Sequence, residues 1–119
     1  MSNPIYINVR NDSAGVVEEA IRESFSNIGF VVTGSATNAS YIAKTEVNYN
    51  KASGTNMTVL YPFISISLVG KSGSVFSFSL KTEKVIAPTE QAAKKIAAQD
   101  IADEINKRLE FNIRKSLGL

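Results

Sequence analysis

Apolar and polar residues alternate with a period of two in several parts of the chain. Four stretches have this pattern: residues 5–10, 41–49, 64–68 and 76–80. Successive side chains of a strand point to opposite faces of a sheet, so each stretch predicts a strand with one buried face. A short apolar run at residues 30–33 predicts one more strand.

Two other stretches repeat apolar residues every three or four positions, which predicts two helices. The first covers about residues 13–28, with N-cap candidates at 11–13. Gly29, followed by apolar Phe30, is expected to end this helix in the left-handed conformation. The second covers about residues 89–116 and would be about 40 Å long, twice a usual strand of about 20 Å. Its last turns are therefore expected to overhang the sheet or to bend around its edge.

The connection between the last two alternating stretches predicts a hairpin register. A two-residue loop would pair Ile66 with Ser77 and so mix the apolar face with the polar face. A three-residue loop at residues 71–73 pairs Ile66 with Phe78 and keeps the apolar faces together. Gly73 is then expected to have a positive φ as part of a G1 bulge.

These elements predict an α+β fold. We expect a two-layer sandwich, with one mostly antiparallel or mixed sheet of four to five strands and two helices on one face (β-α-β-β-β-β-α). The length fits a single domain that covers residues 1–119. Residues 50–57 read as a loop centred on 51–54, and Pro62 indicates a bulge or a strand edge. The residues expected in the core are Ile7, Val9, Phe25, Ile28, Ile66, Phe76, Phe78, Ile101 and Ile105.

The chain has no cysteine, histidine or tryptophan. It therefore lacks thiolate nucleophiles, the usual acid–base group at neutral pH and the commonest metal ligand. The carboxylate pairs Glu18–Glu19 and Asp103–Glu104 are adjacent on predicted helices, so their side chains diverge and read as solvent faces. Serine needs a nearby general base to act as a nucleophile. We therefore expect no enzyme activity, no catalytic residue, no metal site and no cofactor.

The net charge of +2 is too small for a nucleic-acid footprint. RNA-binding sheets also stack bases on exposed aromatic rings, and the outer face offers only Tyr6, with Phe63 as a second candidate. A nucleic-acid-binding module therefore ranks below a protein-interaction domain, and a small ligand-binding protein is the third alternative.

The outer face of the predicted hairpin is rich in serine. Four serines alternate with its apolar residues: Ser65, Ser67, Ser77 and Ser79. Between Thr58 and Leu80 the single charged residue is Lys71. An uncharged strand face is less guarded against association than one rich in lysine. This face is either an ordinary, weakly polar surface or a docking surface for another chain.

The end of the last helix is a second candidate binding surface. Phe111 lies about 200° around the helix from Leu109, so the core is not expected to contain it. Arg108, Arg114 and Lys115 lie near it. An aromatic side chain among cations is typical of interface hot spots. Of the two surfaces, we favour this one for a partner or for self-association; alternatively, Phe111 folds against the edge of the sheet.

Several segments resemble a family of small bacterial envelope domains. They are residues 5–11, a helix that ends in Ile28-Gly29-Phe30, residues 39–43 and an alanine-rich last helix. Ser40 departs from the Ala-Asp-Tyr pattern that is common in the family. The family includes lipoproteins that activate penicillin-binding proteins, the amino-terminal domain of the Tol–Pal translocation protein, and flagellar-assembly and outer-membrane lipoproteins.

The resemblance implies a non-enzymatic domain that binds another envelope protein, in the periplasm or at the outer membrane. It transfers no functional residue. The lipid-bearing cysteine of such lipoproteins is absent here, so a lipid anchor would have to lie upstream. The sequence contains no apolar run of the roughly 20 residues that span a bilayer. A chain without cysteine fits the cytosol as well as the periplasm.

Overall fold

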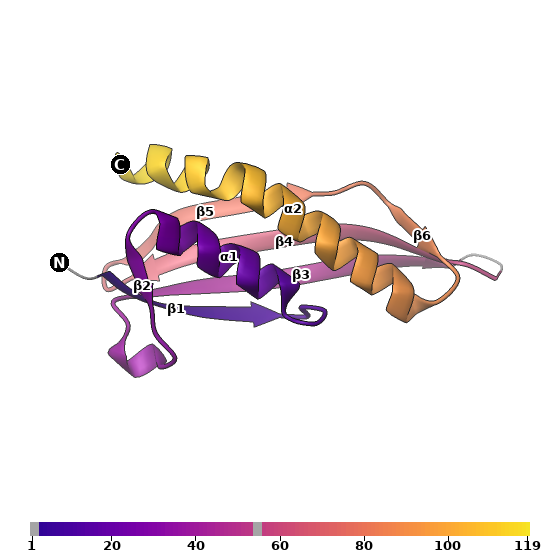
Figure 1. Cartoon of the computed structure of the whole chain (residues 1–119), viewed down its shortest axis with the longest axis horizontal. Helices are drawn as coiled ribbons and strands as arrows, with labels where there is room; N and C mark the ends of the chain where they lie inside the picture. Colours follow the sequence, from indigo (N-terminus) through magenta and orange to yellow (C-terminus); the bar gives the residue numbers. More distant parts are fainter. Residues whose placement is uncertain (1–2, 54–55) are drawn as a thin grey trace.

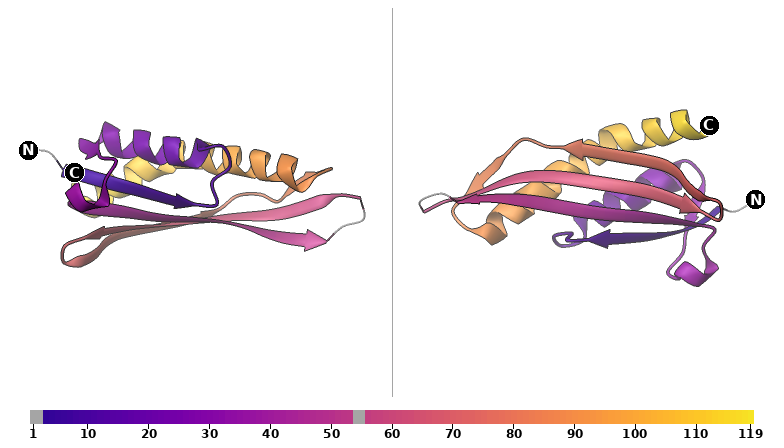
Figure 2. Two further views of the ribbon diagram at one scale, coloured as in Figure 1. Left: turned by 90° about the horizontal axis from the view of Figure 1, so that it is seen from below. Right: turned by 180° about the vertical axis from the view of Figure 1, so that it is seen from behind.

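The computed structural model, which describes residues 3–53 and 56–119, consists of one mixed sheet and two long helices. The helices α1 (Val16–Asn27) and α2 (Glu90–Leu117) both cover the same face of the sheet (Figure 1). Figure 2 shows that no helix of the described residues covers the other face, which we call the open face. The predicted two-layer α+β sandwich with both helices on one face is confirmed.

The sheet has six strands in the described residues, with the order β2-β1-β3-β4-β5 and β6 paired to β4. They are β1 (Asn3–Arg10), β2 (Phe30–Val32), β3 (Tyr41–Ser53), β4 (Thr58–Gly70), β5 (Gly73–Lys81) and β6 (Val85–Ala87). β1 is parallel to both β2 and β3, whereas β4 is antiparallel to β3, β5 and β6. A short 3₁₀ helix, Ala36–Asn38, lies between β2 and β3. β6 was not predicted, because three residues are too few to show a period of two.

β3 and β4 are longer than the sequence predicts. Residues 50–53, expected in a loop, continue β3, and Asn50 and Ala52 pair with Tyr61 and Val59 of β4. Lysine, alanine and asparagine have weak strand propensity, and cross-strand pairing overrides that preference here. The loop prediction is therefore wrong for residues 50–53; residues 54 and 55 lie outside the described residues.

α2 packs against the core along its whole length. Its buried residues are Ala93, Ala97, Ala98, Ile101, Ala102, Ile105, Leu109 and Ile113. β3 and β4 have 13 residues each, which is about 43 Å of strand and equals the roughly 42 Å of this helix. At its end, the Nη2 atom of Arg114 donates a hydrogen bond to the carbonyl of Asn27, 3.2 Å away. The last turns thus do not overhang the strand ends. The overhang was expected because strands of the usual length, about 20 Å, were assumed.

α1 begins three residues later than predicted. Gly15 is the N-cap residue, with a φ of 73° and no side chain to cap the helix. The carboxylate of Asp12 takes this role and accepts hydrogen bonds from the amides of Val17 and Glu18, at 3.0 and 2.9 Å. It satisfies two of the amide groups that a helix start leaves without partners. At the other end, Gly29 has the predicted positive φ, 99°.

The core lies between the helices and the inner face of the sheet. Seven of the nine residues predicted there are buried, and Val9 and Ile28 are partly buried against it. Phe25, Phe30 and Tyr41 form a chain of edge-to-face contacts, with ring centroids 5.3 and 5.5 Å apart. This geometry favours aromatic pairs beyond their buried area, and it ties α1 to β2 and β3.

The β4–β5 hairpin has the predicted register, with Ile66 opposite Phe78 and a φ of 112° at Gly73. The three-residue loop, however, is wrong. Gly70 pairs with Gly73, so the loop has two residues, and Val75 is the extra residue that forms a bulge in β5. The apolar faces fix the register of the two strands. They do not fix the position of the extra residue, because an extra residue in the turn and an extra residue in a bulge change the register by the same amount.

Beside Pro62, the strand that pairs with β4 changes from β5 to β6. On the β3 side it pairs with Tyr49 without a bulge. On the other side, β5 reaches only Phe63, and β6 begins its pairing at Leu60. Pro62 therefore occupies a local strand edge, one of the two alternatives that its missing amide donor indicates.

Tyr49 provides a test of polar burial. Its hydroxyl is buried without a hydrogen-bond partner among the described residues. Burial, with the charge of Asp12 as a second cause, raises the pKa of Tyr49 to about 12, against about 10 in an unfolded chain. Stability should therefore be lost as the pH rises from about 10 to about 12, where the unfolded chain releases the proton first.

We expect Tyr49→Phe to raise the free energy of unfolding by about 1 kcal/mol at neutral pH, because a buried unpaired hydroxyl costs about 1–3 kcal/mol. The alkaline unfolding midpoint, measured by circular dichroism, should also rise. A less stable variant with an unchanged alkaline midpoint would show that the hydroxyl has a partner.

Candidate functional site

The four predicted serines lie together on the open face. Ser67 is opposite Ser77, and Ser65 is opposite Ser79, in two neighbouring rows of β4 and β5. Three of them are exposed and Ser67 is half-buried. The sequence correctly placed them on one face.

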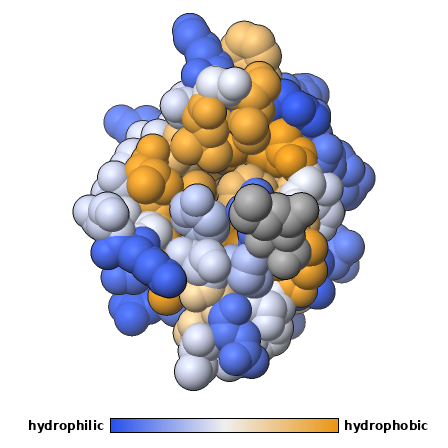
Figure 3. Space-filling model, turned by 90° about the vertical axis from the view of Figure 1, so that its left-hand side faces the viewer, coloured by the Kyte–Doolittle hydropathy of each residue, from blue (hydrophilic) through white to orange (hydrophobic). Residues whose placement is uncertain are grey.

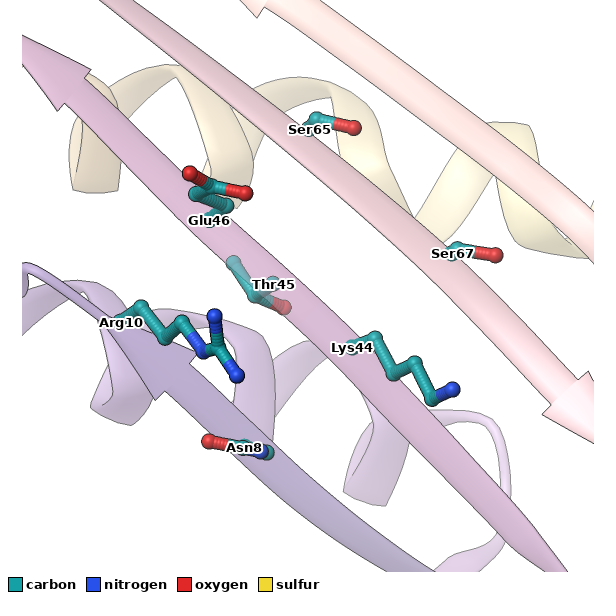
Figure 4. Close-up of a pocket in the computed structure, with 7 residues that line it drawn as sticks. All are labelled: Asn8, Arg10, Lys44, Thr45, Glu46, Ser65 and Ser67. Atoms are coloured by element: carbon teal, nitrogen blue, oxygen red, sulfur yellow. The ribbon is translucent and has the colours of Figure 1, made fainter.

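The two serine rows continue into charged residues on β3 and β1. Ser67 is followed across the sheet by Lys44 and then by Asn8; Ser65 is followed by Glu46 and then by Arg10. Together with Thr45 they line a shallow hollow of about 380 Å³ (Figure 4). Sequence reasoning did not find this hollow, because the order of β1 and β3 beside β4 has no local signal.

The hollow is a hydrogen-bonding surface. Arg10 and Lys44 supply cations, Glu46 supplies a carboxylate, and none of the ion pairs in the described chain includes them. Figure 4 shows these side chains on the same side of the sheet as Ser65 and Ser67. Within the described residues, no hydrogen bond joins Ser65 to the carboxylate of Glu46, and a serine without a base is a weak nucleophile.

The open face also carries apolar side chains. Tyr61 and Ile86 are about half exposed, at 49% and 50%, towards the end of the sheet where β6 lies. Tyr61 thus joins half-buried Tyr6 and Phe63 as an aromatic residue of this face. The sequence did not predict that Tyr61 lies on this face, because residues 50–57 read as a loop and Pro62 as a bulge or a strand edge.

β5 forms an edge of the sheet. It pairs with β4, and no other strand of the described residues lies on its far side. It has nine residues, and residues 73–80 carry no charge. Such an edge presents unpaired amide and carbonyl groups that can pair with another strand. At the opposite edge, β2 has only three residues and covers the start of β1.

Phe111 is 68% exposed, the largest exposed fraction among the large apolar side chains that the structure describes. The prediction that the core does not contain it is confirmed. The neighbouring arginines, however, contact the protein itself. The guanidinium of Arg108 lies 5.8 Å from the ring centre of Phe78. Arg114 donates to Glu110 at 3.3 Å, besides its bond to Asn27.

Two carboxyl groups near α2 have shifted pKa values. A hydrogen bond from Lys51, 3.0 Å away, lowers the pKa of Glu90. Burial, and then the charges of Asp103 and Glu83, raise the pKa of Asp100. Among residues 3–53 and 56–119, no group of three or more acidic side chains is placed to hold a metal ion. The two pKa shifts are explained by an ion pair at Glu90 and by burial at Asp100, so neither indicates a catalytic pair.

No protein-family model matches the chain, and no curated protein does. Solved structures do. A minor lipoprotein of Acinetobacter baumannii has a TM-score of 0.62 at 10% identity, over 93% of this chain and 92% of its own. A provisionally assigned lipoprotein of Caulobacter crescentus CB15 has a TM-score of 0.56 at 16% identity, over 98% and 90%. A Xanthomonas campestris protein of the DUF330 family has 0.57 at 11%, over 99% and 88%.

The chain thus shares the fold of bacterial lipoprotein domains. The resemblance to such domains is confirmed at the level of the fold, across nearly the whole length of both chains. The finer expectation, a relative of penicillin-binding-protein activators, of the Tol–Pal protein or of flagellar lipoproteins, stays a prediction. Neither helix of the described residues is apolar enough over sufficient length to cross a membrane.

Proposed function

We propose that this chain is a non-enzymatic domain of the bacterial cell envelope that binds another protein along the β5 edge. The observation that carries this proposal is the nine-residue edge strand β5, which has no charge from Gly73 to Leu80 and, among the described residues, no strand beyond the exposed Ser77 and Ser79. An extended segment of a partner can add a strand there, so that main-chain hydrogen bonds provide affinity. Each such bond contributes about 0.5–1.5 kcal/mol.

The chemistry of the chain supports a binding role without catalysis. It has no histidine or cysteine, so the serines of the open face lack the usual base that would activate a hydroxyl group. Binding through an edge strand needs only backbone groups and small polar side chains, which β5 supplies. The hollow beside it adds the charges of Arg10, Lys44 and Glu46 for a partner that extends over the open face.

The proposed location is the periplasm or the outer membrane, with a lipid anchor upstream. The support for this location is the fold, which the chain shares with bacterial lipoproteins. A test is protease accessibility of the native protein in whole cells, in cells with a permeabilised outer membrane and in lysed cells. Digestion that begins only after lysis would place the protein in the cytosol.

The partner surface can be tested with a photo-crosslinking residue at Ser79, in the bacterium that carries the gene. We expect a discrete crosslinked protein from this position and none from Ser26, an exposed serine on α1. In a second chain, the crosslinking residue is placed at Ser77 and Ser79 is replaced by lysine. Ser79→Lys should abolish the crosslinked product, because a lysine on an edge strand disfavours pairing with another strand.

Ser65→Lys is the matched control, because Ser65 lies opposite Ser79 in the same row but on the central strand β4. It should keep the crosslink to the partner. Equal loss in both lysine variants would place the contact on the open face instead of the edge. A crosslink from Phe111 with none from β5 would move the protein partner to the end of α2.

A further inference from the structure

The backbone of β5 presents its free hydrogen-bonding groups at fixed positions along the edge. The amide of Thr82, just after β5, donates to the carbonyl of Pro62 of β4, 3.3 Å away. In an antiparallel pair, residues that bond to the neighbouring strand alternate with residues whose amide and carbonyl groups point away from it. From residue 76 to 82, where the pairing has no bulge, the even-numbered residues therefore bond to β4. Ser77 and Ser79 direct their amide and carbonyl groups outwards, where the described residues place no strand.

These positions restrict how a second copy of the chain can add its own β5 to the edge. Two antiparallel copies of one strand pair with a constant sum of residue numbers, and hydrogen bonding requires odd-numbered residues opposite odd-numbered ones. Side chains opposite each other lie on the same face of a sheet, so both copies then carry their helices on the same side. The result is one continuous sheet around a two-fold axis, which is an isologous contact.

The charges beside β5 differ between its two ends. The turn that precedes β5 carries one charged residue, the exposed Lys71. Beyond the other end lies a hollow of about 350 Å³, and two lysines and four acidic residues are among those that line it: Lys81, Lys107, Glu83, Asp100, Asp103 and Glu104. No ion pair of the described chain includes any of these residues or Lys71. Four acids against two lysines leave an excess of two negative charges, which a cation of a neighbouring chain can reduce.

One register brings these unlike ends together. With Phe78 on the two-fold axis, Ser77 of one copy lies opposite Ser79 of the other. Measured along β4, Phe78 pairs with residue 66, the turn follows residue 70, and Glu83 falls between the partners of residues 62 and 60. Lys71 and Glu83 are thus about five strand positions from the axis, on opposite sides of it. The two-fold axis therefore places Lys71 of each copy beside Glu83 of the other.

We propose that the protein that pairs with the β5 edge is a second copy of this chain, related by a two-fold axis at Phe78. This inference rests on the proposed function, because it names the partner of the same edge. Main-chain hydrogen bonds between Ser77 of one copy and Ser79 of the other join the two sheets. Lys71 of each copy lies at the acidic hollow of the other.

Arg108 opposes this contact. Its guanidinium lies 5.8 Å from the ring centre of Phe78, so the dimer brings two arginines near the axis. Like charges that face each other across paired strands are destabilising. Arg108→Gln should therefore strengthen the dimer several-fold, whereas it would leave the affinity unchanged if the copies met far from β5.

Sedimentation velocity of the purified whole chain tests the proposal. We expect a concentration-dependent equilibrium between one and two copies. Ser79→Lys should abolish the dimer, whereas the matched Ser65→Lys on the central strand β4 should keep it. Lys71→Glu alone and Glu83→Lys alone should each weaken the dimer by about threefold or more, because each removes two exposed ion pairs. The chain with both substitutions should regain the original affinity within about twofold, since its ion pairs are only reversed.

Single cysteines test the register, because the chain has no cysteine of its own. Chains with Ser77→Cys and chains with Ser79→Cys, mixed and oxidised, should form a disulfide, since the Cα atoms of opposite residues lie about 5.5 Å apart. Either variant alone should not, because its two cysteines are diagonal neighbours at about 7–8 Å. Mixed Ser65→Cys and Ser67→Cys chains are the control, because three strand spacings, about 14 Å, separate their cysteines. A disulfide in Ser77→Cys alone and none in the mixture would contradict the axis at Phe78.

The end of the molecule that carries the C-terminus and the β4–β5 turn is the competing surface. Apolar side chains gather in the upper middle of this end (Figure 3), and Leu119 is 63% exposed. Leu119→Ser should change the dimer affinity by less than about twofold, because truncations outside the centre of an interface are nearly neutral. If Leu119→Ser or Phe111→Ser dissociates the dimer and Ser79→Lys does not, the copies meet at the end of α2 and the proposal is wrong.

A chain that sediments as a monomer at every concentration would also overturn the proposal. If Ser79 still gives a crosslink to a different protein in the cell, binding at the β5 edge stands and the second copy is the wrong partner. If Ser79 gives no crosslink either, the proposed function fails as well. Circular dichroism checks that every variant folds.

Discussion

Phe78→Ala is expected to lower the free energy of unfolding by about 3–5 kcal/mol. Phe78 is only 9% exposed and lies opposite Ile66 in the hairpin. Its ring stacks on Phe76 with centroids 6.4 Å apart, and the guanidinium of Arg108 covers it from α2. Truncation to alanine removes the ring from these contacts and leaves a cavity under α2 that the paired strands cannot close.

Urea denaturation followed by circular dichroism measures this loss, and Phe111→Ala is the matched control. It makes the same chemical change at a side chain that is 68% exposed, so its effect should stay within about 0.5 kcal/mol. A Phe78→Ala midpoint equal to that of Phe111→Ala would show that β5 does not pack against α2 as described.

The elements that the sequence predicted best are those with a complete local pattern. Ile66 and Phe78 belong to long alternating stretches, and a slip of one residue would turn every apolar side chain of β5 to water. The local pattern alone therefore determines the register. The stripe of α2 was predicted for the same reason, since Ala93 to Ile113 repeat at helical spacing.

The elements that the sequence missed depend on contacts between distant segments. Residues 50–53 have weak strand propensity and form a strand because β4 offers partners for them. The start of α1 was misplaced because Asp12 caps it from outside the N-cap position. The parallel pairing of β1 with β3 has no local signal either, and it is this pairing that creates the hollow between Arg10, Glu46 and Ser65.

The candidate surfaces show the same division. Phe111 was predicted to be exposed because helical spacing alone takes it off the buried stripe. The roles of its neighbours were not predictable, because Arg108 contacts Phe78 and Arg114 contacts Asn27, on other elements. Both arginines therefore help to hold α2 in place.

Gly73→Val is expected to lower the free energy of unfolding by about 1–3 kcal/mol, the range for a residue held in a sparsely populated backbone conformation. Gly73 has a φ of 112°, and a Cβ atom built there meets nothing within 4 Å. The cost therefore comes from the backbone alone, because a β-branched residue disfavours positive φ. The bulge at Val75 adds to it, since the turn and the bulge share the residues between Gly70 and Phe76.

Gly34→Val separates this backbone cost from the general effect of adding a valine. Gly34 has equally open surroundings and no positive φ, so its replacement should change the unfolding free energy by less than about 0.5 kcal/mol. The hairpin predicts a second difference: amide exchange in β5 should accelerate in Gly73→Val and stay unchanged in Gly34→Val, since only the former strains the β4–β5 pairing. Equal stability of the two variants would mean that residue 73 adopts a negative φ in Gly73→Val, and the turn between β4 and β5 would then differ from the one described.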